Sequence, residues 1–71
     1  MRFTDLNDYC ESNPQLKERF IAAELGIDPS RFSKLKSRKY GLQPTDAEAE
    51  AIASLLNQPR SYVRRLYVRA A

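Results

Sequence analysis

A dense group of basic and hydroxyl side chains lies between residues 30 and 40 of this 71-residue chain. Residues 31–40 carry five lysines and arginines and no acid, and serines stand at positions 30, 33 and 37. Lysine and arginine side chains pair with phosphate oxygens and donate hydrogen bonds to guanine, and a serine side chain is short enough to permit close approach. These residue types at this spacing predict recognition of a nucleic acid.

The net charge of +3 hides a segregation of charge along the chain. Residues 1–30 contain six acids and three bases, residues 41–58 contain three acids and no base, and residues 59–71 contain four arginines and no acid. The largest positive block therefore falls on residues 31–40. A basic run on a helix is often only a solvated surface, but the acidic surroundings favour a binding surface here.

Two short helices joined by a tight turn are expected to position this basic segment, the second of them over Pro29–Lys36. Apolar residues recur between positions 18 and 37 at spacings of three and four, which is the pattern of amphipathic helices. Gly26 lies where the chain must leave the first helix, and glycine adopts the required positive φ without strain. Asp28 is expected to cap the second helix, and proline suits its first turn because the missing N–H would be unpaired there. The residues expected to be buried together are Ile21, Ala22, Leu25, Ile27, Phe32 and Leu35.

One further helix is expected before the helix that ends at Gly26. It covers Thr4–Glu11, with Thr4 as its N-cap. The triplet at 12–14 then breaks the chain, and Asn13 and Pro14 are expected to begin a helix that continues to Leu25. The inward positions are expected to be Leu6, Tyr9 and Cys10 in the first helix, and Leu16, Phe20 and Ala23 in the second.

The C-terminal third predicts two more helices. Thr45 and Glu48 have the spacing of a capping box, so a helix is expected to begin after Thr45 and to end near Asn57. A last helix is expected over Pro59–Arg69. The apolar residues at helical spacing are Ala47, Ala51, Ile52, Leu55 and Leu56 in the former, and Tyr62, Val63, Leu66, Tyr67 and Ala70 in the latter. No segment alternates as a strand does, so the fold class is predicted to be all-α, one domain over residues 1–71.

The segment 18–37 resembles the helix-turn-helix of lambda-repressor and Cro-type phage regulators, on the residues just described. The resemblance covers about Leu16–Leu56. It implies a compact cluster of four or five helices in which the second helix of the motif reads double-stranded DNA. Two positions depart from the family pattern: Glu18 stands where glutamine is common, and Pro29 stands where a glutamine often contacts a base.

The resemblance also implies a set of DNA-contacting residues. Ser30, Ser33 and Lys34 match positions that touch base edges in the family, and Arg31 is expected to reach guanine or a phosphate. Ser37 faces outward with them. The residues expected to contact the backbone or flanking bases past the helix are Lys36, Arg38, Lys39 and Tyr40. For Tyr40 the favoured alternative is a packing role.

A homodimer is expected, because one recognition helix touches few phosphates and a two-fold dimer matches a palindromic operator. The candidate dimer interface is the last helix, residues 59–70, through Tyr62, Val63, Leu66 and Tyr67. The alternative is that this helix folds back to close the core of the monomer. The arginines at 60, 64, 65 and 69 are open to DNA contact, to covering such an interface or to solvation.

Other classes of function find little support in the composition. The chain has no histidine and one cysteine, so neither a metal site nor an internal disulfide is expected, and no cofactor or small-molecule ligand is implied. No nucleophile–base set predicts an enzyme. No apolar run is long enough for a membrane span, which favours the cytoplasm and, for a DNA-binding protein, the nucleoid. The sequence predicts a phage-type transcriptional repressor acting by operator occlusion. The alternatives are a protein-interaction module of the anti-repressor type, or a DNA-binding accessory factor in recombination or replication.

Overall fold

The computed structural model describes residues 2–38 and 41–67, and residues 1, 39–40 and 68–71 lie outside the described part. Five helices occupy that part: α1 Leu6–Ser12, α2 Glu18–Leu25, α3 Pro29–Ser37, α4 Asp46–Leu56 and α5 Arg60–Leu66. No strand occurs among the described residues. The predicted all-α fold class is confirmed.

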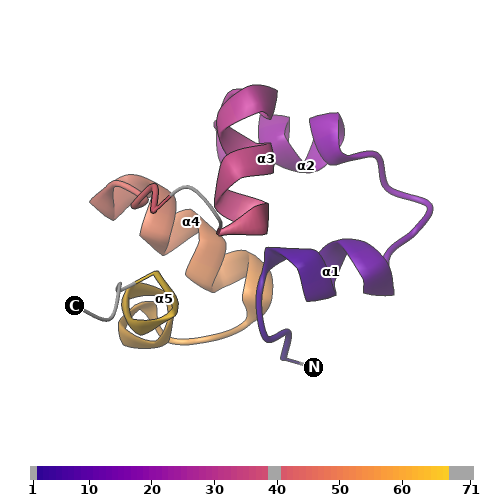
Figure 1. Ribbon diagram of the computed structural model, residues 1–71. Helices are drawn as coiled ribbons and strands as arrows, with labels where there is room; N and C mark the ends of the chain where they lie inside the picture. The colour runs from indigo at the N-terminus through magenta and orange to yellow at the C-terminus, as the bar shows by residue number, and fades with distance from the viewer. Residues whose placement is uncertain (1, 39–40, 68–71) are drawn as a thin grey trace.

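The helices surround a single core that lies beneath α3 (Figure 1). α2 and α3 stand together at one end, α4 runs past the other end of α3, and α5 packs beside α4. Phe32 and Leu35 of α3 are 0% exposed, so the inner face of this helix is fixed in the centre of the molecule. The buried residues are Leu6, Ile21, Ala22, Ile27, Phe32, Leu35, Ala49, Ile52, Ala53, Leu56, Val63 and Tyr67.

The turn between α2 and α3 has the predicted construction. Gly26 ends α2 with a φ of 71°, in the left-handed region that glycine adopts without strain. The N–H of Ile27 donates to the carbonyl of Ala22 across the turn, at 2.9 Å. Asp28 caps α3 by accepting from the N–H of Ser30, and Pro29 is the first helical residue. The predicted start of this helix is confirmed, and the helix extends one residue beyond its predicted end, to Ser37.

The predicted capping box at the start of α4 is also confirmed. The Thr45 side chain accepts from the N–H of Glu48, and the Glu48 side chain accepts from the N–H of Thr45. Asn57 ends the helix in the left-handed conformation, with a φ of 57°. The buried stripe includes Ala49 and Ala53, whereas Ala47, predicted to face inward, is exposed.

The start of α1 and the start of α2 differ from the sequence prediction. Asp5, and not Thr4, caps α1, since its carboxylate accepts from the N–H of Asp8 at 2.7 Å. Asn13 does not open α2, because its side-chain amide donates back to the carbonyl of Tyr9 and closes α1. The chain then passes through a turn, and α2 begins only at Glu18.

The predicted inward positions before the motif are corrected by the same shift. Leu16 precedes α2 and is 40% exposed, and Phe20 within α2 is 58% exposed. Ala23 is exposed as well. The reason is geometric: the helix turns Ile21 and Ala22 toward α3, and this puts Phe20 and Ala23 on the opposite side.

Candidate nucleic-acid interface

The outer face of α3, defined as Ser30, Ser33, Lys34 and Ser37, is directed away from the core. All four residues are exposed, as the sequence predicted. A helix turns about 100° per residue, so these positions lie opposite Phe32 and Leu35. The face therefore consists of three short hydroxyl side chains and one cation.

Lys34 is the cation of this face, and it makes no ion pair with any residue in the described part of the chain. The other described cations of the basic segment all have carboxylate partners, which come from three different elements. The pairs are Arg31 with Glu48, Lys36 with Glu18 and Arg38 with Asp5. Lys39 and Tyr40, also predicted to contact DNA, lie outside the described residues.

Arg31 forms the best-oriented of these pairs. Its Nε and Nη2 atoms donate to the two carboxylate oxygens of Glu48, each at 2.7 Å, and Nη2 also donates to the carbonyl of Gln43 at 3.1 Å. The hydrogen bond raises the pKa of Arg31 and lowers the pKa of the Glu48 carboxyl. Glu48 is also part of the capping box with Thr45, so Arg31 joins α3 to the start of α4. This geometry favours a positioning role for Arg31 over the predicted contact with a base or phosphate.

Lys36 is held by the first residue of α2. Its Nζ lies 2.7 Å from a carboxylate oxygen of Glu18, and this hydrogen bond raises the pKa of Lys36. Glu18 is one of the two positions at which the sequence departs from the pattern of the regulators it resembles. The pair neutralises the carboxylate that would otherwise repel a phosphate backbone, and it ties the two helices of the motif together.

Arg38 is the residue that ends α3, in the left-handed conformation with a φ of 57°. Its Nη2 lies 2.9 Å from Oδ2 of Asp5, the residue that caps α1. The other oxygen of the Asp5 carboxylate accepts the N–H of Asp8, so the same side chain caps α1 and binds Arg38. The result is a link between the first helix and the C-terminal end of α3.

Tyr67 also holds α3 in place, and the sequence left its role open between a dimer interface and the core. Its hydroxyl donates to the carbonyl of Leu35 at 2.9 Å, and Gln43 donates to the carbonyl of Tyr67 at 2.9 Å. Burial raises the pKa of Tyr67 to about 12. With Val63 it belongs to the core of the monomer, so neither residue offers surface to a dimer partner in this structure. The alternative prediction, that the last helix closes the monomer core, describes these two residues.

The rest of α5 is less buried. Tyr62 and Leu66 are half-buried, and the hydroxyl of Tyr62 donates to the carbonyl of Thr4 at 2.7 Å. Arg64 pairs with Asp46 of α4, and Arg60 and Arg65 are exposed. The predicted Arg69 and Ala70 of this helix lie outside the described residues. A dimer through Tyr62 and Leu66 stays a prediction.

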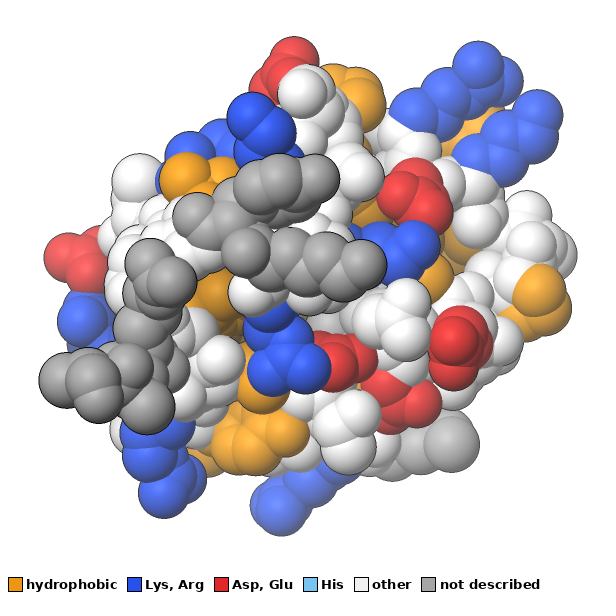
Figure 2. Space-filling model, in the orientation of Figure 1, with side chains coloured by type: hydrophobic (Ala, Val, Ile, Leu, Met, Phe, Trp, Pro, Cys, Tyr) orange, Lys and Arg blue, Asp and Glu red, His pale blue; other side chains and the backbone are white. Residues whose placement is uncertain are grey.

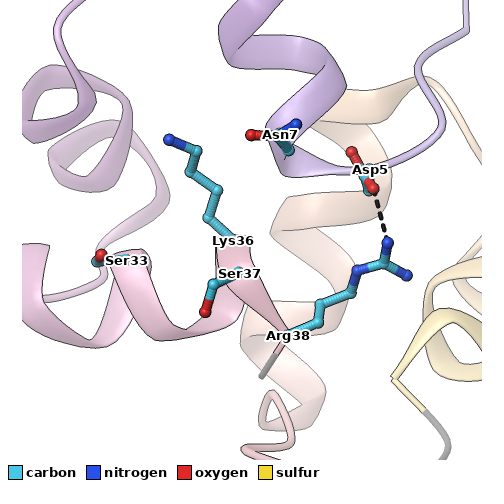
Figure 3. A pocket seen from close by; sticks show the side chains of 6 residues that line it. All are labelled: Asp5, Asn7, Ser33, Lys36, Ser37 and Arg38. Carbon is cyan, nitrogen blue, oxygen red and sulfur yellow. Dashed lines mark hydrogen bonds and ion pairs between the residues drawn. The ribbon is translucent and has the colours of Figure 1, made fainter. Parts of the chain in front are cut away.

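A polar cleft of about 380 Å³ opens beside the outer face, between the start of α1 and the C-terminal half of α3 (Figure 3). Its lining residues are Asp5, Asn7, Ser33, Lys36, Ser37 and Arg38. Ser33 thus belongs both to the outer face and to the cleft. The side chains of Asp5 and Arg38 meet at one end of the cleft, where their ion pair joins α1 to α3.

The surface is a mosaic of charge and not a uniformly basic area. In Figure 2, Lys and Arg side chains extend over the upper right end, where α2 lies, and Asp and Glu side chains gather below them over α1. At that end of α2 the guanidinium of Arg19 lies 5.1 Å from the centre of the Phe20 ring. The sequence did not predict the carboxylates that pair with the cations of α3. Their spacing along the chain, 17 residues for Arg31–Glu48 and 33 for Arg38–Asp5, hides the pairing from any local pattern.

Comparisons with known proteins return no relative: no family model matches the chain, and no curated protein and no solved structure matches it. None of the described helices has the length and apolar character needed to span a membrane.

Proposed function

We propose that this protein is a sequence-specific double-stranded DNA-binding regulator that inserts the outer face of α3 into the major groove. The observation that carries the proposal is the outward direction of Ser30, Ser33 and Lys34 on a helix whose opposite side is buried. An α-helix fits the major groove, where lysine can donate to guanine and serine to any base edge. The resemblance to lambda-repressor and Cro-type regulators supports the same placement.

The bracing of α3 suits this function. Ion pairs tie it to α1, α2 and α4, and the hydroxyl of Tyr67 ties its last turn to the segment that follows α5. Reading base edges requires side chains whose backbone is held to within a fraction of an ångström. Arg31, Lys36 and Arg38 supply that rigidity in the unbound protein, and Lys34 remains available for DNA.

The small number of unpaired cations on the outer face favours binding as a pair. A homodimer would present two copies of Lys34 and its serines to a palindromic operator, and the affinity of one copy would be low. We propose repression by occlusion of a promoter in a phage or mobile element, with the protein acting at the nucleoid in the cytoplasm. A DNA-binding accessory factor in recombination or replication would share the same contacts.

Selection of bound sequences from a random duplex library, followed by titration at several salt concentrations, tests the proposal. We expect a palindromic consensus. If a dimer neutralises about 6–8 phosphates, the slope of log affinity against log salt is expected to be about −5 to −7. No enrichment over the starting library would contradict sequence-specific binding, and a slope near zero would contradict the phosphate contacts.

A second candidate function rests on Leu16 and Phe20, which are exposed apolar residues at the start of the motif. Exposed apolar groups beside a binding helix are typical of surfaces that contact another protein. This observation favours an interaction module of the anti-repressor type. A Phe20→Ser variant separates the two: it is expected to retain DNA binding under the first proposal and to lose capture of a protein partner under the second.

A further inference from the structure

The cleft between α1 and α3 contains two cations, two serines and an asparagine in a space large enough for a phosphate group. The guanidinium of Arg38 reaches the cleft from α3, whereas the Lys36 side chain points away from Arg38 and its Nζ lies 2.7 Å from Glu18 (Figure 3). The side-chain amide of Asn7, on α1, donates to Glu11 at 3.2 Å. The Asp5 carboxylate lies at the Arg38 end of the cleft and accepts a hydrogen bond from Arg38 at 2.9 Å. Arg38 is therefore a donor in the cleft whose acceptor the protein itself supplies.

We propose that this cleft is a binding site for a phosphate of the DNA backbone, and that the Asp5 carboxylate occupies the place of a phosphate oxygen until DNA arrives. The inference deepens the proposed function and rests on it, because it names the backbone contact of the same interface. It adds α1, through Asn7, to the surface that meets DNA.

The chemistry of Arg38 supports the exchange. A guanidinium binds carboxylate and phosphate oxygens through the same parallel N–H donors, so Arg38 can pass from one to the other without changing its hydrogen-bonding pattern. The pair with Asp5 lies near the surface, with 39% of the Arg38 side chain exposed, and exposed pairs are weak. A phosphate can therefore displace the carboxylate.

Asp5 can release Arg38 without unfolding α1. Its Oδ1 atom accepts the N–H of Asp8 at 2.7 Å, and this cap does not involve Oδ2, the atom that contacts Arg38. Asparagine is as good a helix N-cap as aspartate. An Asp5→Asn substitution thus removes the negative charge that pairs with Arg38 and keeps the N-cap of α1.

The location of the cleft fits a backbone contact made together with base reading. Ser33 lines the cleft and also belongs to the outer face of α3. The phosphates of a duplex line both edges of the major groove, so a helix that places Ser33 and Lys34 in the groove brings one edge toward the cleft. Arg38 would then fix the register of the helix and leave base discrimination to the outer face.

The test is a set of titrations with the selected duplex, using wild type, Asp5→Asn, Arg38→Gln and the double variant. Asp5→Asn is expected to bind about two- to fivefold more tightly than wild type, since it frees Arg38 from an exposed ion pair. Arg38→Gln is expected to weaken binding and to reduce the magnitude of the salt slope by about 0.9 per monomer. In the Arg38→Gln background, Asp5→Asn is expected to give no gain.

Asp8→Asn is the matched control, because it removes the same charge one turn along α1 from a residue outside the cleft. Thermal unfolding of each variant confirms that α1 is intact. An equal gain from Asp5→Asn and Asp8→Asn, or a gain that survives in the Arg38→Gln background, would overturn the site and leave general electrostatics as the cause. Unchanged or weaker binding by Asp5→Asn would overturn it as well. A wild-type protein that binds no duplex would instead overturn the proposed function.

A second experiment tests whether the cleft binds a phosphate of the DNA backbone or a free phosphate ion. Inorganic phosphate is added to wild type and to Asp5→Asn at constant ionic strength, and the backbone amides of Asn7 and Ser37 are followed by NMR. We expect these amides to shift with duplex at micromolar concentration and to stay in place with millimolar phosphate. Saturable binding of inorganic phosphate below millimolar concentration would overturn the assignment to DNA in favour of a free anion.

Discussion

The outer face of α3 and its flanks differ in what their cations do, although both lie on one nine-residue helix. On the outer face, Lys34 has no carboxylate partner among the described residues. On the flanks and at the end of the helix, Arg31, Lys36 and Arg38 each meet an acid from another element. The difference shows that position around the helix axis, and not residue type, decides which cations have carboxylate partners in this structure. A basic segment thus overstates the charge available to a ligand.

The largest expected effect comes from a core substitution beneath α3, because the core holds the outer face and the flanks of this helix alike. Phe32→Ala removes a fully buried ring from under α3 and is expected to cost about 3–5 kcal/mol of unfolding free energy. That is a large part of the stability of a small domain. Denaturant unfolding measures it. Ser33→Ala, next along the helix but on the outer face, is the control and is expected to stay within about 0.5 kcal/mol of wild type. Similar losses from both variants would refute the assignment of the two faces.

Lys34→Ala tests whether the outer face of α3 contacts bases. It is expected to cost on the order of 1–3 kcal/mol of binding free energy on the selected duplex, with stability unchanged, and to relax the preference at one base pair in each half-site. Competition binding against single-base variants of the duplex measures it. An equal loss on all sequences would mean that Lys34 contacts only phosphate.

Tyr67→Phe tests the bracing side. The substitution removes the hydrogen bond to the carbonyl of Leu35 and is expected to cost about 1 kcal/mol of unfolding free energy. The pKa of Tyr67 is raised by burial to about 12, so the folded state holds this proton more tightly than the unfolded chain. The stabilisation is complete below pH 10 and is lost as the pH rises from about 10 toward about 12.

Unfolding free energy measured between pH 9 and 12 is the readout for Tyr67. Wild type and Tyr9→Phe are expected to lose stability over this range, and Tyr67→Phe is expected to lose less. A decline of the same size in Tyr67→Phe would show that this hydroxyl is not the group that titrates.

The smallest effect concerns the pair between Arg31 and Glu48. The pKa of Glu48 is lowered by its hydrogen bond with Arg31, so its contribution to stability is present above its ordinary pKa, 4.5. It is lost as the pH falls from there through the folded value. Glu48→Gln is expected to flatten the acid limb of a stability–pH curve, and the exposed Glu50→Gln, on the same helix, is not. Curves of the same shape for both variants would count against this bond as a brace.

Local rules predicted the parts of the fold that depend on neighbouring residues. Gly26, Asp28, the capping box at Thr45 and the buried pair Phe32 and Leu35 follow from turn chemistry and helical spacing, and all are confirmed. The start of α2 did not follow, because Asn13 can cap a helix before it or after it. In the structure the side chain of Asn13 donates to the Tyr9 carbonyl, so this residue closes α1.

The sequence predicted which residues of α3 face outward, but it did not predict which of its cations pair with acids. Outward-facing Ser30, Ser33 and Lys34 follow from the position of the core residues on the same helix. The partners of Arg31 and Arg38 depend on how α1 and α4 pack against α3, and no spacing rule contains that information. The role of Tyr67 stayed open for the same reason, since an apolar stripe on a last helix fits a core and a dimer interface equally well.

NMR mapping of the selected duplex onto the protein tests whether the outer face of α3 is the surface that contacts DNA. We expect DNA to shift the resonances of Ser30, Ser33 and Lys34 most, including the lysine side-chain signals, with smaller shifts around the cleft. Shifts centred on Leu16 and Phe20, with α3 unchanged, would contradict it.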